Sequence, residues 1–294
     1  MFDSTDVWVG RRFGSYQVED VLGKGTTATV YRAYRLGDGP PLEVALKVLN
    51  PFAMANSSIV AMFEAEAELL GRLDHPNIVA VHGAGEVAGS FFMATDLHEG
   101  GTAWDRVTPD KKMTEVETLR LGKEIADALD HVHQNDIVHR DVKPSNILAA
   151  GVGAVLFDFG LALDLRGPAP PAGRVFGSPL FISPEQALGQ PADGRADLYG
   201  LGVTMYRLAS GKAPWYGERA QLLDAHVNDT PPDPADLGVS RELADVILHL
   251  MRKDPADRPQ TGADLVRALA EIEPAVNEAA AAAPQGRKRR WFGR

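Results

Sequence analysis

The hydrophobic pattern of this chain changes its period after about the first third of the sequence. Residues 16–50 are rich in β-branched and aromatic residues, and a turn containing Gly23 and Gly25 divides their first part into two runs. This pattern predicts antiparallel strands joined by a hairpin. From residue 56 onward the apolar residues recur at helical spacing. A strand-rich start followed by a helical remainder predicts an α+β chain with two lobes.

The clearest helical pattern lies in residues 114–134. Leu121, Ile125, Leu129 and Val132 fall on one face there, as expected for a helix with a buried apolar stripe. The sequence contains no internal repeat that would favour a solenoid. The predicted helices cover, roughly, residues 56–73, 114–134, 198–210, 218–227, 240–252 and 262–272.

Composition and charge exclude several classes of protein. The 294 residues include no cysteine, which excludes disulfides and thiolate zinc sites and fits a reducing compartment, so we expect a cytoplasmic protein. We expect no signal peptide or membrane span, because no long apolar run is present. The net charge is −10, although residues 287–294, RKRRWFGR, carry five positive charges. The rest of the chain is therefore acidic, which argues against a nucleic-acid partner.

Two features of the strand region suggest an anion-binding site. Gly23 and Gly25 would let the backbone approach an anionic ligand. Their place between two strands disfavours the Rossmann and Walker motifs. Lys47 lies in the apolar strand VALKV, and an unpaired buried charge is costly. Glu66, on the following predicted helix, is the candidate partner; the alternative is a lysine whose end reaches solvent.

Three further motifs follow in order: HRDVKPSN at residues 139–146, FDFG at 157–160 and SPE at 183–185. Together with the glycine turn and the strand lysine, they resemble the signature set of protein kinases. Five motifs in this order, each in a matching strand, helix or loop context, argue against chance. Lys143 is typical of serine/threonine kinases. The chain is identified as a member of the bacterial eukaryote-like serine/threonine protein kinase family.

The resemblance implies a two-lobed protein-kinase fold over residues 16–272. The N-lobe would cover about residues 16–97 and the C-lobe about 98–272. A lead-in of residues 1–15 would precede them. Residues 273–294 would form a flexible tail, first alanine-rich and then basic.

The resemblance also assigns catalytic and metal-binding roles. Asp141 would accept the proton of the substrate hydroxyl, and Lys143 would neutralise charge on the transferring phosphoryl group. Asn146 and Asp158 would hold Mg²⁺ or Mn²⁺ against the phosphates of ATP.

The resemblance places ATP against the glycine turn and the end of the N-lobe. Lys47, held by Glu66, would bind the α- and β-phosphates. Ala28 stands where the family's loop has its third glycine, a mild departure that adds one methyl group. Thr95 would be the gatekeeper, and the backbones of Asp96 and His98 would meet the adenine. The expected ATP contacts are Leu22, Gly23, Lys24, Gly25, Thr26, Thr27, Ala28, Val30, Ala45, Lys47, Thr95, Asp96 and His98.

Other conspicuous residues have structural roles by the same resemblance. His139 would pack under the catalytic loop, which is the HRDVKPSN segment of residues 139–146, and Asp197 would brace the backbone of that loop. Glu185 and Arg258 would form a buried ion pair.

Residues 161–178 would form the activation loop, which in many kinases carries a phosphate that pairs with the arginine of HRD, here Arg140. No hydroxyl lies between Asp158 and Phe176. Ser178 would contact Asp141 and Lys143 rather than act as a switch. Two interpretations remain open, and we favour the first. In the first, proline stiffness and packing hold the loop, so the kinase is constitutively competent or is controlled by a partner. In the second, autophosphorylation occurs elsewhere. Candidates for the second are Thr26, Thr27, Thr29, Ser57 and Ser58.

The sequence therefore predicts a kinase that moves the γ-phosphate of ATP to Ser or Thr of protein substrates. One alternative is a pseudokinase scaffold that binds ATP and partners, and another is a small-molecule phosphotransferase. The expected partners are ATP and protein substrates, with no nucleic acid. Membrane contact would involve only the basic residues 287–294, and a dimer through the N-lobe is left open.

Overall fold

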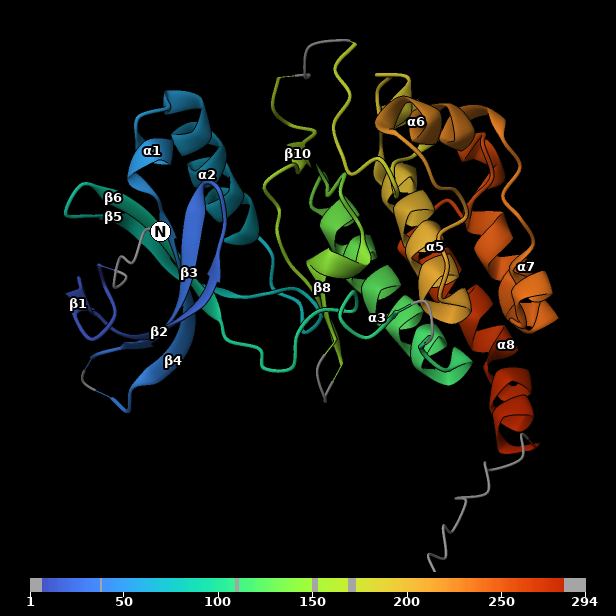
Figure 1. Cartoon of the computed structure of the whole chain (residues 1–294), viewed down its shortest axis with the longest axis horizontal. Coiled ribbons are helices and arrows are strands. Elements are labelled where there is room, and N and C mark those ends of the chain that lie inside the picture. Colours follow the sequence, from blue (N-terminus) through green and yellow to red (C-terminus); the bar gives the residue numbers. More distant parts are fainter. Residues whose placement is uncertain (1–6, 38, 109–110, 150–152, 169–172, 283–294) are drawn as a thin grey trace, which may run out of the picture.

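The computed structural model describes residues 7–37, 39–108, 111–149, 153–168 and 173–282. It has two lobes: a small one built on a sheet, and a larger one built mainly of helices (Figure 1). The predicted two-lobed α+β arrangement is confirmed.

The small lobe contains a six-stranded antiparallel sheet in the order β1-β2-β3-β4-β6-β5. Its second and third strands form the predicted hairpin. In β4, Lys47 lies opposite Val30 on one side and Met93 on the other, which places the lysine in the middle of the sheet. The strands are β1 (Arg12–Phe13), β2 (Tyr16–Lys24), β3 (Ala28–Arg35), β4 (Leu42–Leu49), β5 (Val81–Val87) and β6 (Ser90–Asp96).

A 14-residue helix, α2 (Ser57–Leu70), lies beside this sheet and follows the short α1 (Pro51–Met54). Asn56 caps α2 by accepting the backbone N–H of Ser58. Phe63, Glu66 and Leu70 are all buried, and their spacing puts them on one face of the helix. The same periodicity that packs α2 on the core therefore turns Glu66 inward.

The larger lobe is organised around α5 (Gly194–Ser210), which is buried along most of its length. It packs against α3 (Glu115–Gln134) and α7 (Arg241–Leu250), while α8 (Gly262–Ala282) lies against α3 (Figure 1). The predicted stripe of α3 is at most 3% exposed. The remaining elements are α4 (Pro184–Ala187), α6 (Arg219–Asn228), β7 (Ile137–Val138), β8 (Ile147–Ala149), β9 (Ala154–Leu156), β10 (Leu163–Asp164) and 3₁₀ turns at Pro144–Asn146, Pro234–Leu237 and Pro255–Asp257.

Both ends of the fold extend further than the sequence predicted. Phe13 of the expected lead-in pairs with Tyr16 in the sheet and is fully buried, with the ring of Trp8 against it. The predicted flexible tail from residue 273 is wrong for residues 273–282, which continue α8. Alanine is the best helix former, and Val276 is buried in the core. Residues 287–294 lie outside the described residues.

No helix in the described ranges is both long enough and apolar enough to cross a membrane.

Candidate active site

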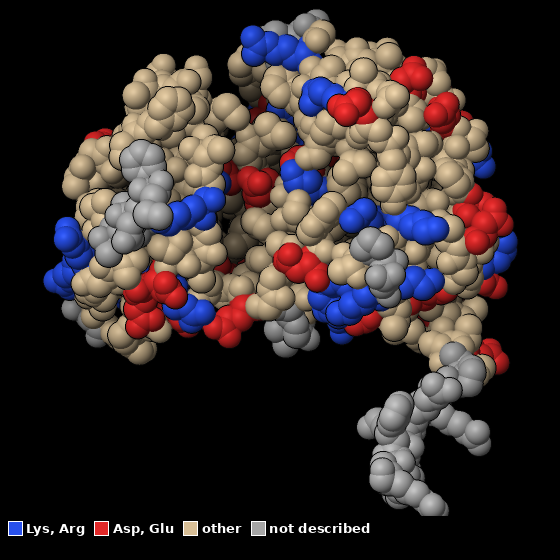
Figure 2. Space-filling model, viewed as in Figure 1, with Lys and Arg blue, Asp and Glu red and all other residues tan. Residues whose placement is uncertain are grey.

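The HRDVKPSN segment, residues 139–146, lies between β7 and β8. Where the two lobes meet, the surface is hollowed and carries both basic and acidic side chains (Figure 2). Asp197, on buried α5, fixes the backbone of this segment through its carboxylate. Its Oδ2 accepts the backbone N–H of His139 at 2.8 Å, and its Oδ1 accepts that of Arg140 at 2.7 Å. His133 Nε2 lies 2.9 Å from Oδ2. The left-handed backbone of Arg140, with φ of 64°, is thus held in place by a buried carboxylate.

Asp141, the next residue, is 8% exposed, and donors from two segments surround its carboxylate. Lys143 Nζ lies 2.5 Å from Oδ2, and the Ser178 backbone N–H donates to Oδ1 at 2.9 Å. Lys143 also donates to Ser178 Oγ at 2.8 Å. Asn146 Nδ2 donates to the Asp141 carbonyl at 3.0 Å and to Oδ2 at 3.2 Å. A carboxylate positioned in this way is suited to orienting a hydroxyl and accepting its proton.

Lys47 and Glu66 form the expected ion pair. Lys47 Nζ lies 2.8 Å from Oε2 and 3.1 Å from Oε1 of Glu66, whose side chain is 4% exposed. Burial raises the pKa of the Glu66 carboxyl, while Lys47 and the backbone N–H of Phe159 lower it. Gly160 lies close to both Glu66 and Asp158, since a Cβ there would come within 3.7 Å of Glu66 Oε2 and 3.4 Å of Asp158 Oδ1. The ion pair therefore joins β4, α2 and the FDFG motif.

Asn50, which belongs to none of the sequence motifs, holds the tip of the β2–β3 hairpin. Its Nδ2 donates to the Gly25 carbonyl at 3.1 Å, its backbone N–H donates to the Thr27 carbonyl at 2.8 Å, and its Oδ1 accepts from Thr29 Oγ1 at 2.9 Å. Thr29 is 7% exposed, so its hydroxyl is occupied and does not suit the suggested autophosphorylation. The only signal in the sequence was a polar residue directly after a strand and before a proline.

The expected phosphate contacts lie at this tip. Gly25 donates its N–H to the Ala28 carbonyl at 2.9 Å, and a Cβ at Gly25 would approach that oxygen to 3.1 Å. A Cβ added at Gly23 would meet nothing within 4 Å. Ala28 begins β3 and is buried, and Val30 is half-buried opposite Lys47. The remaining tip residues are exposed: Leu22, Lys24, Thr26 and Thr27.

The expected adenine contacts lie at the end of β6. Thr95 pairs with Ala45 of β4. The backbone N–H of Asp96 donates to the Ala80 carbonyl at 3.0 Å, and the Asp96 carbonyl accepts from Thr95 Oγ1 at 3.4 Å. His98 is half-buried, and its Nε2 has no hydrogen-bond partner among the described residues.

Asn146 and Asp158 offer oxygen donors for a divalent cation. The bonds that Asn146 makes to Asp141 use the amide nitrogen, so the amide oxygen is the atom that a cation would take. Amide and carboxylate oxygens fit Mg²⁺ or Mn²⁺. In the described part of the chain, no group of three or more His, Asp or Glu residues could hold a metal without other ligands.

A groove of about 420 Å³ lies beside the cluster that Asp141 forms with Lys143, Asn146 and Ser178. Lys143 and Ser178 line it, together with apolar side chains that include Trp104, Leu180 and Leu222. It could hold an extended peptide next to Asp141.

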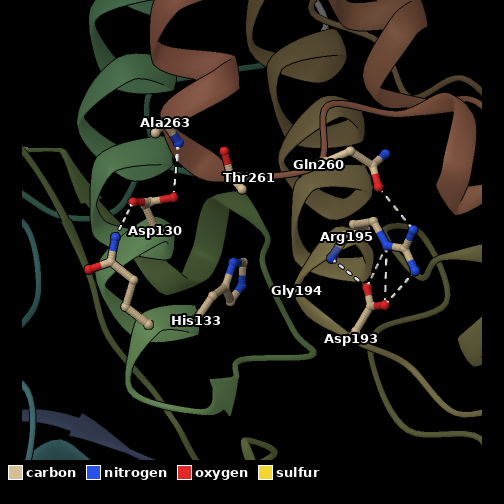
Figure 3. A pocket seen from close by; sticks show the side chains of 9 residues that line it. Asp130, His133, Asp193, Gly194, Arg195, Gln260, Thr261 and Ala263 are labelled. Atoms are coloured by element: carbon tan, nitrogen blue, oxygen red, sulfur yellow. Dashed lines mark hydrogen bonds and ion pairs between the residues drawn. The ribbon is translucent and has the colours of Figure 1, made fainter.

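A second cavity, of about 520 Å³, is lined by residues of α3 and by residues at the starts of α5 and α8 (Figure 3). Its polar groups are paired with one another: Arg195 binds Asp193, and Asp130 accepts the Ala263 backbone N–H. His133 lines the cavity and bonds Asp197. We assign this cavity to the packing of the three helices rather than to catalysis.

The segment that ends in SPE, residues 183–185, is anchored by a buried ion pair. Arg258 Nη1 and Nη2 donate to the two carboxylate oxygens of Glu185, each at 2.8 Å, and the Arg258 side chain is fully buried. The guanidinium also donates to the carbonyls of Arg195, Arg252 and Lys253.

Comparisons with known sequences agree with this geometry. The family described as "Protein kinase domain" matches residues 16–268. Serine/threonine-protein kinase PknJ of Mycobacterium tuberculosis is 38% identical over 272 residues, covering 89% of this chain and 46% of PknJ. PrkC of Bacillus subtilis is 34% identical over 264 residues, covering 87% of this chain and 40% of PrkC. The chain thus spans less than half the length of these relatives.

Among solved structures, the chain is similar to a double mutant of the Mycobacterium tuberculosis PknI kinase domain. The two share 29% sequence identity and a TM-score of 0.68, over 92% of this chain and 100% of that one.

Proposed function

The chain belongs to the protein kinase domain family, and on that premise we propose that it transfers the γ-phosphate of ATP to serine or threonine hydroxyls of protein substrates. The observation that carries the proposal is the Asp141 cluster, in which Lys143, Asn146 and Ser178 hold one carboxylate beside a groove. Phosphoryl transfer needs positioning and charge neutralisation more than covalent chemistry, and this cluster supplies both.

In the proposed reaction, a peptide lies in the groove with its hydroxyl against Asp141. The carboxylate orients that hydroxyl and takes its proton as the oxygen attacks the γ-phosphorus and the bond to the leaving diphosphate breaks. Lys143 offsets negative charge on the transferring group. Because Ser178 bonds both residues, the arrangement is tied to the segment that forms the groove.

ATP would lie between the hairpin tip and the end of β6. Lys47 would bind its α- and β-phosphates, and the ion pair with Glu66 supports this role because it orients the ammonium group. The open space at Gly23 would admit the phosphates. The Asp96 carbonyl and the His98 backbone would meet the adenine edge.

Asn146 and Asp158 would hold the divalent cation, Mg²⁺ or Mn²⁺. The cation would neutralise charge on the phosphates, as divalent ions do in this class of reaction. Their oxygen donors favour these hard ions over softer metals.

We further propose that residues 16–272, extended by the rest of α8, act as one kinase domain in the cytoplasm. The absence of cysteine fits a reducing compartment. Its partners would be ATP and protein substrates, and contact with acidic lipid would need residues 287–294. Dimerisation through the N-lobe belongs to the same proposal.

The test is to incubate the purified protein with Mg²⁺ and γ-labelled ATP, with a basic protein or a set of small alcohols and sugars as acceptor. We expect label on the protein acceptor, recovered as phosphoserine or phosphothreonine. Label on small molecules alone would favour a small-molecule phosphotransferase. ATP binding with no transfer to any acceptor would favour a pseudokinase scaffold.

A further inference from the structure

Arg140 has an unusual set of partners for a cation beside a catalytic aspartate. Its Nε donates to the Leu161 carbonyl at 2.7 Å, and its Cζ lies 4.8 Å from the centre of the Phe176 ring. Within the described ranges, no carboxylate forms an ion pair with it. Burial lowers the pKa of Arg140, while the charge of Asp197 raises it. Arg140 is half-buried, and an aromatic face attracts a guanidinium more strongly as water is excluded from the contact.

The backbones of Arg140 and Phe176 are also tied together. Gln186 Nε2 donates to the Arg140 carbonyl at 2.9 Å and to the Phe176 carbonyl at 3.2 Å. Gly177, with φ of 116°, comes so close that a Cβ there would lie 3.0 Å from the Arg140 carbonyl. The glycine thus permits the contact, and Gln186 locks it.

This contact lies directly beside the reacting groups. Ser178, two residues after Phe176, donates its backbone N–H to Asp141 Oδ1. Arg140 directly precedes Asp141. Arg140 and Phe176, which stack on each other, are therefore each within two residues of the hydrogen bond from Ser178 to the Asp141 carboxylate.

A phosphate on the activation loop commonly orders a kinase by pairing with arginine, but residues 159–175 contain no Ser, Thr or Tyr. We propose that Phe176 is a positioning residue, which holds Arg140 through its ring in place of a loop phosphate and so keeps Asp141 and Ser178 in their reactive arrangement. This inference rests on the proposed function and deepens it, because it makes the kinase competent without loop phosphorylation.

The test compares Phe176→Leu, which keeps apolar bulk but removes the aromatic face, with Phe176→Tyr, which keeps the face. We expect Phe176→Leu to lower kcat on the order of 10-fold with the KM for ATP changed less than twofold. Phe176→Tyr should stay within about twofold of the wild type. In an Arg140→Met background, Phe176→Leu should cause no further loss, since the cation is already gone.

An equal loss in both backgrounds, or no loss in Phe176→Leu, would overturn the proposal. Amide hydrogen exchange gives a second readout that does not depend on activity. Phe176→Leu should speed exchange at the Ser178 amide, while Phe176→Tyr should not. If the wild type transfers no phosphate, the proposed function fails, and unchanged exchange at Ser178 in Phe176→Leu would separately reject the stacking role.

Discussion

Arg258 and Glu185 form a two-pronged ion pair inside the larger lobe, with both N–H···O distances at 2.8 Å. Removing one partner leaves the other charge buried and unpaired, which costs on the order of 3–5 kcal/mol. We therefore expect Glu185→Gln to lower the free energy of unfolding by about that amount in urea denaturation. The exposed pair of Arg241 and Asp245 is the matched control, and Asp245→Asn should cost less than about 1 kcal/mol. Equal effects of the two changes would contradict the account.

Breaking the ion pair of Lys47 and Glu66 should impair the use of ATP. Glu66→Gln keeps the shape but removes the charge that orients Lys47, so kcat/KM for ATP should fall on the order of 10²-fold. The control is Glu64→Gln, because Glu64 is on the exposed face of the same helix and should leave activity unchanged. Steady-state kinetics at varied ATP concentration would measure kcat/KM for both variants. A Glu66→Gln enzyme as active as the wild type would show that the pair does not serve ATP binding.

Loss of the Asn50 side chain should affect the hairpin tip and not the Asp141 cluster. Asn50→Ala removes the side-chain bonds to Gly25, Thr26 and Thr29, so the tip should become more mobile. We expect the KM for ATP to rise several-fold while kcat changes little, because the Asp141 cluster is untouched. Asn56→Ala, which removes only the cap of α2, is the comparison variant. A fall in kcat at an unchanged KM would contradict this role.

His226 makes stability depend on pH. It is fully buried, and its Nδ1 lies 2.9 Å from the Tyr199 hydroxyl. Burial, with the charge of Lys253, lowers the pKa of His226 to about 4, although backbone groups of Pro179 and Leu180 oppose the shift. The unfolded histidine titrates near 6.5, so the unfolded state binds more protons between these values. Stability is therefore complete above about pH 6.5 and is lost as the pH falls toward 4.

Urea unfolding at pH 7.5 and pH 5 would measure this loss. Between these values the wild type should lose about 2 kcal/mol more than His226→Gln. Glutamine still offers the Tyr199 hydroxyl a partner. The pKa of Lys253 is lowered by burial to about 8, so its own contribution changes at higher pH, outside this window. Equal losses in both proteins would reject the assignment to His226.

Local patterns predicted most of the fold but not its edges. The hairpin and α3 follow from the spacing of apolar residues that are close together in the sequence. Two-residue β1 is too short to show a period, and it forms because Phe13 meets the ring of Phe92 at 5.6 Å across the sheet. The extension of α8 past Pro274 was missed because proline usually ends a helix, whereas the packing of Val276 retains this one.

The site divides in the same way. The motifs predicted which residues meet around Asp141 and Lys47, because their spacing reflects a shared chemical task. Asn50 and Phe176 carry no such motif. Their importance comes from contacts made only when the strands and the activation loop have folded against distant segments, which sequence spacing does not reveal.

The most direct measurement is the rate of phosphate transfer by the wild type and by Asp141→Asn, with ATP affinity measured in parallel. Asparagine keeps the shape but cannot take the proton of the hydroxyl. We expect kcat to fall at least on the order of 10²-fold, the lower bound for losing a general base, while the affinity for ATP stays within about threefold. Transfer by Asp141→Asn at the wild-type rate would contradict the central claim that this carboxylate carries the reaction.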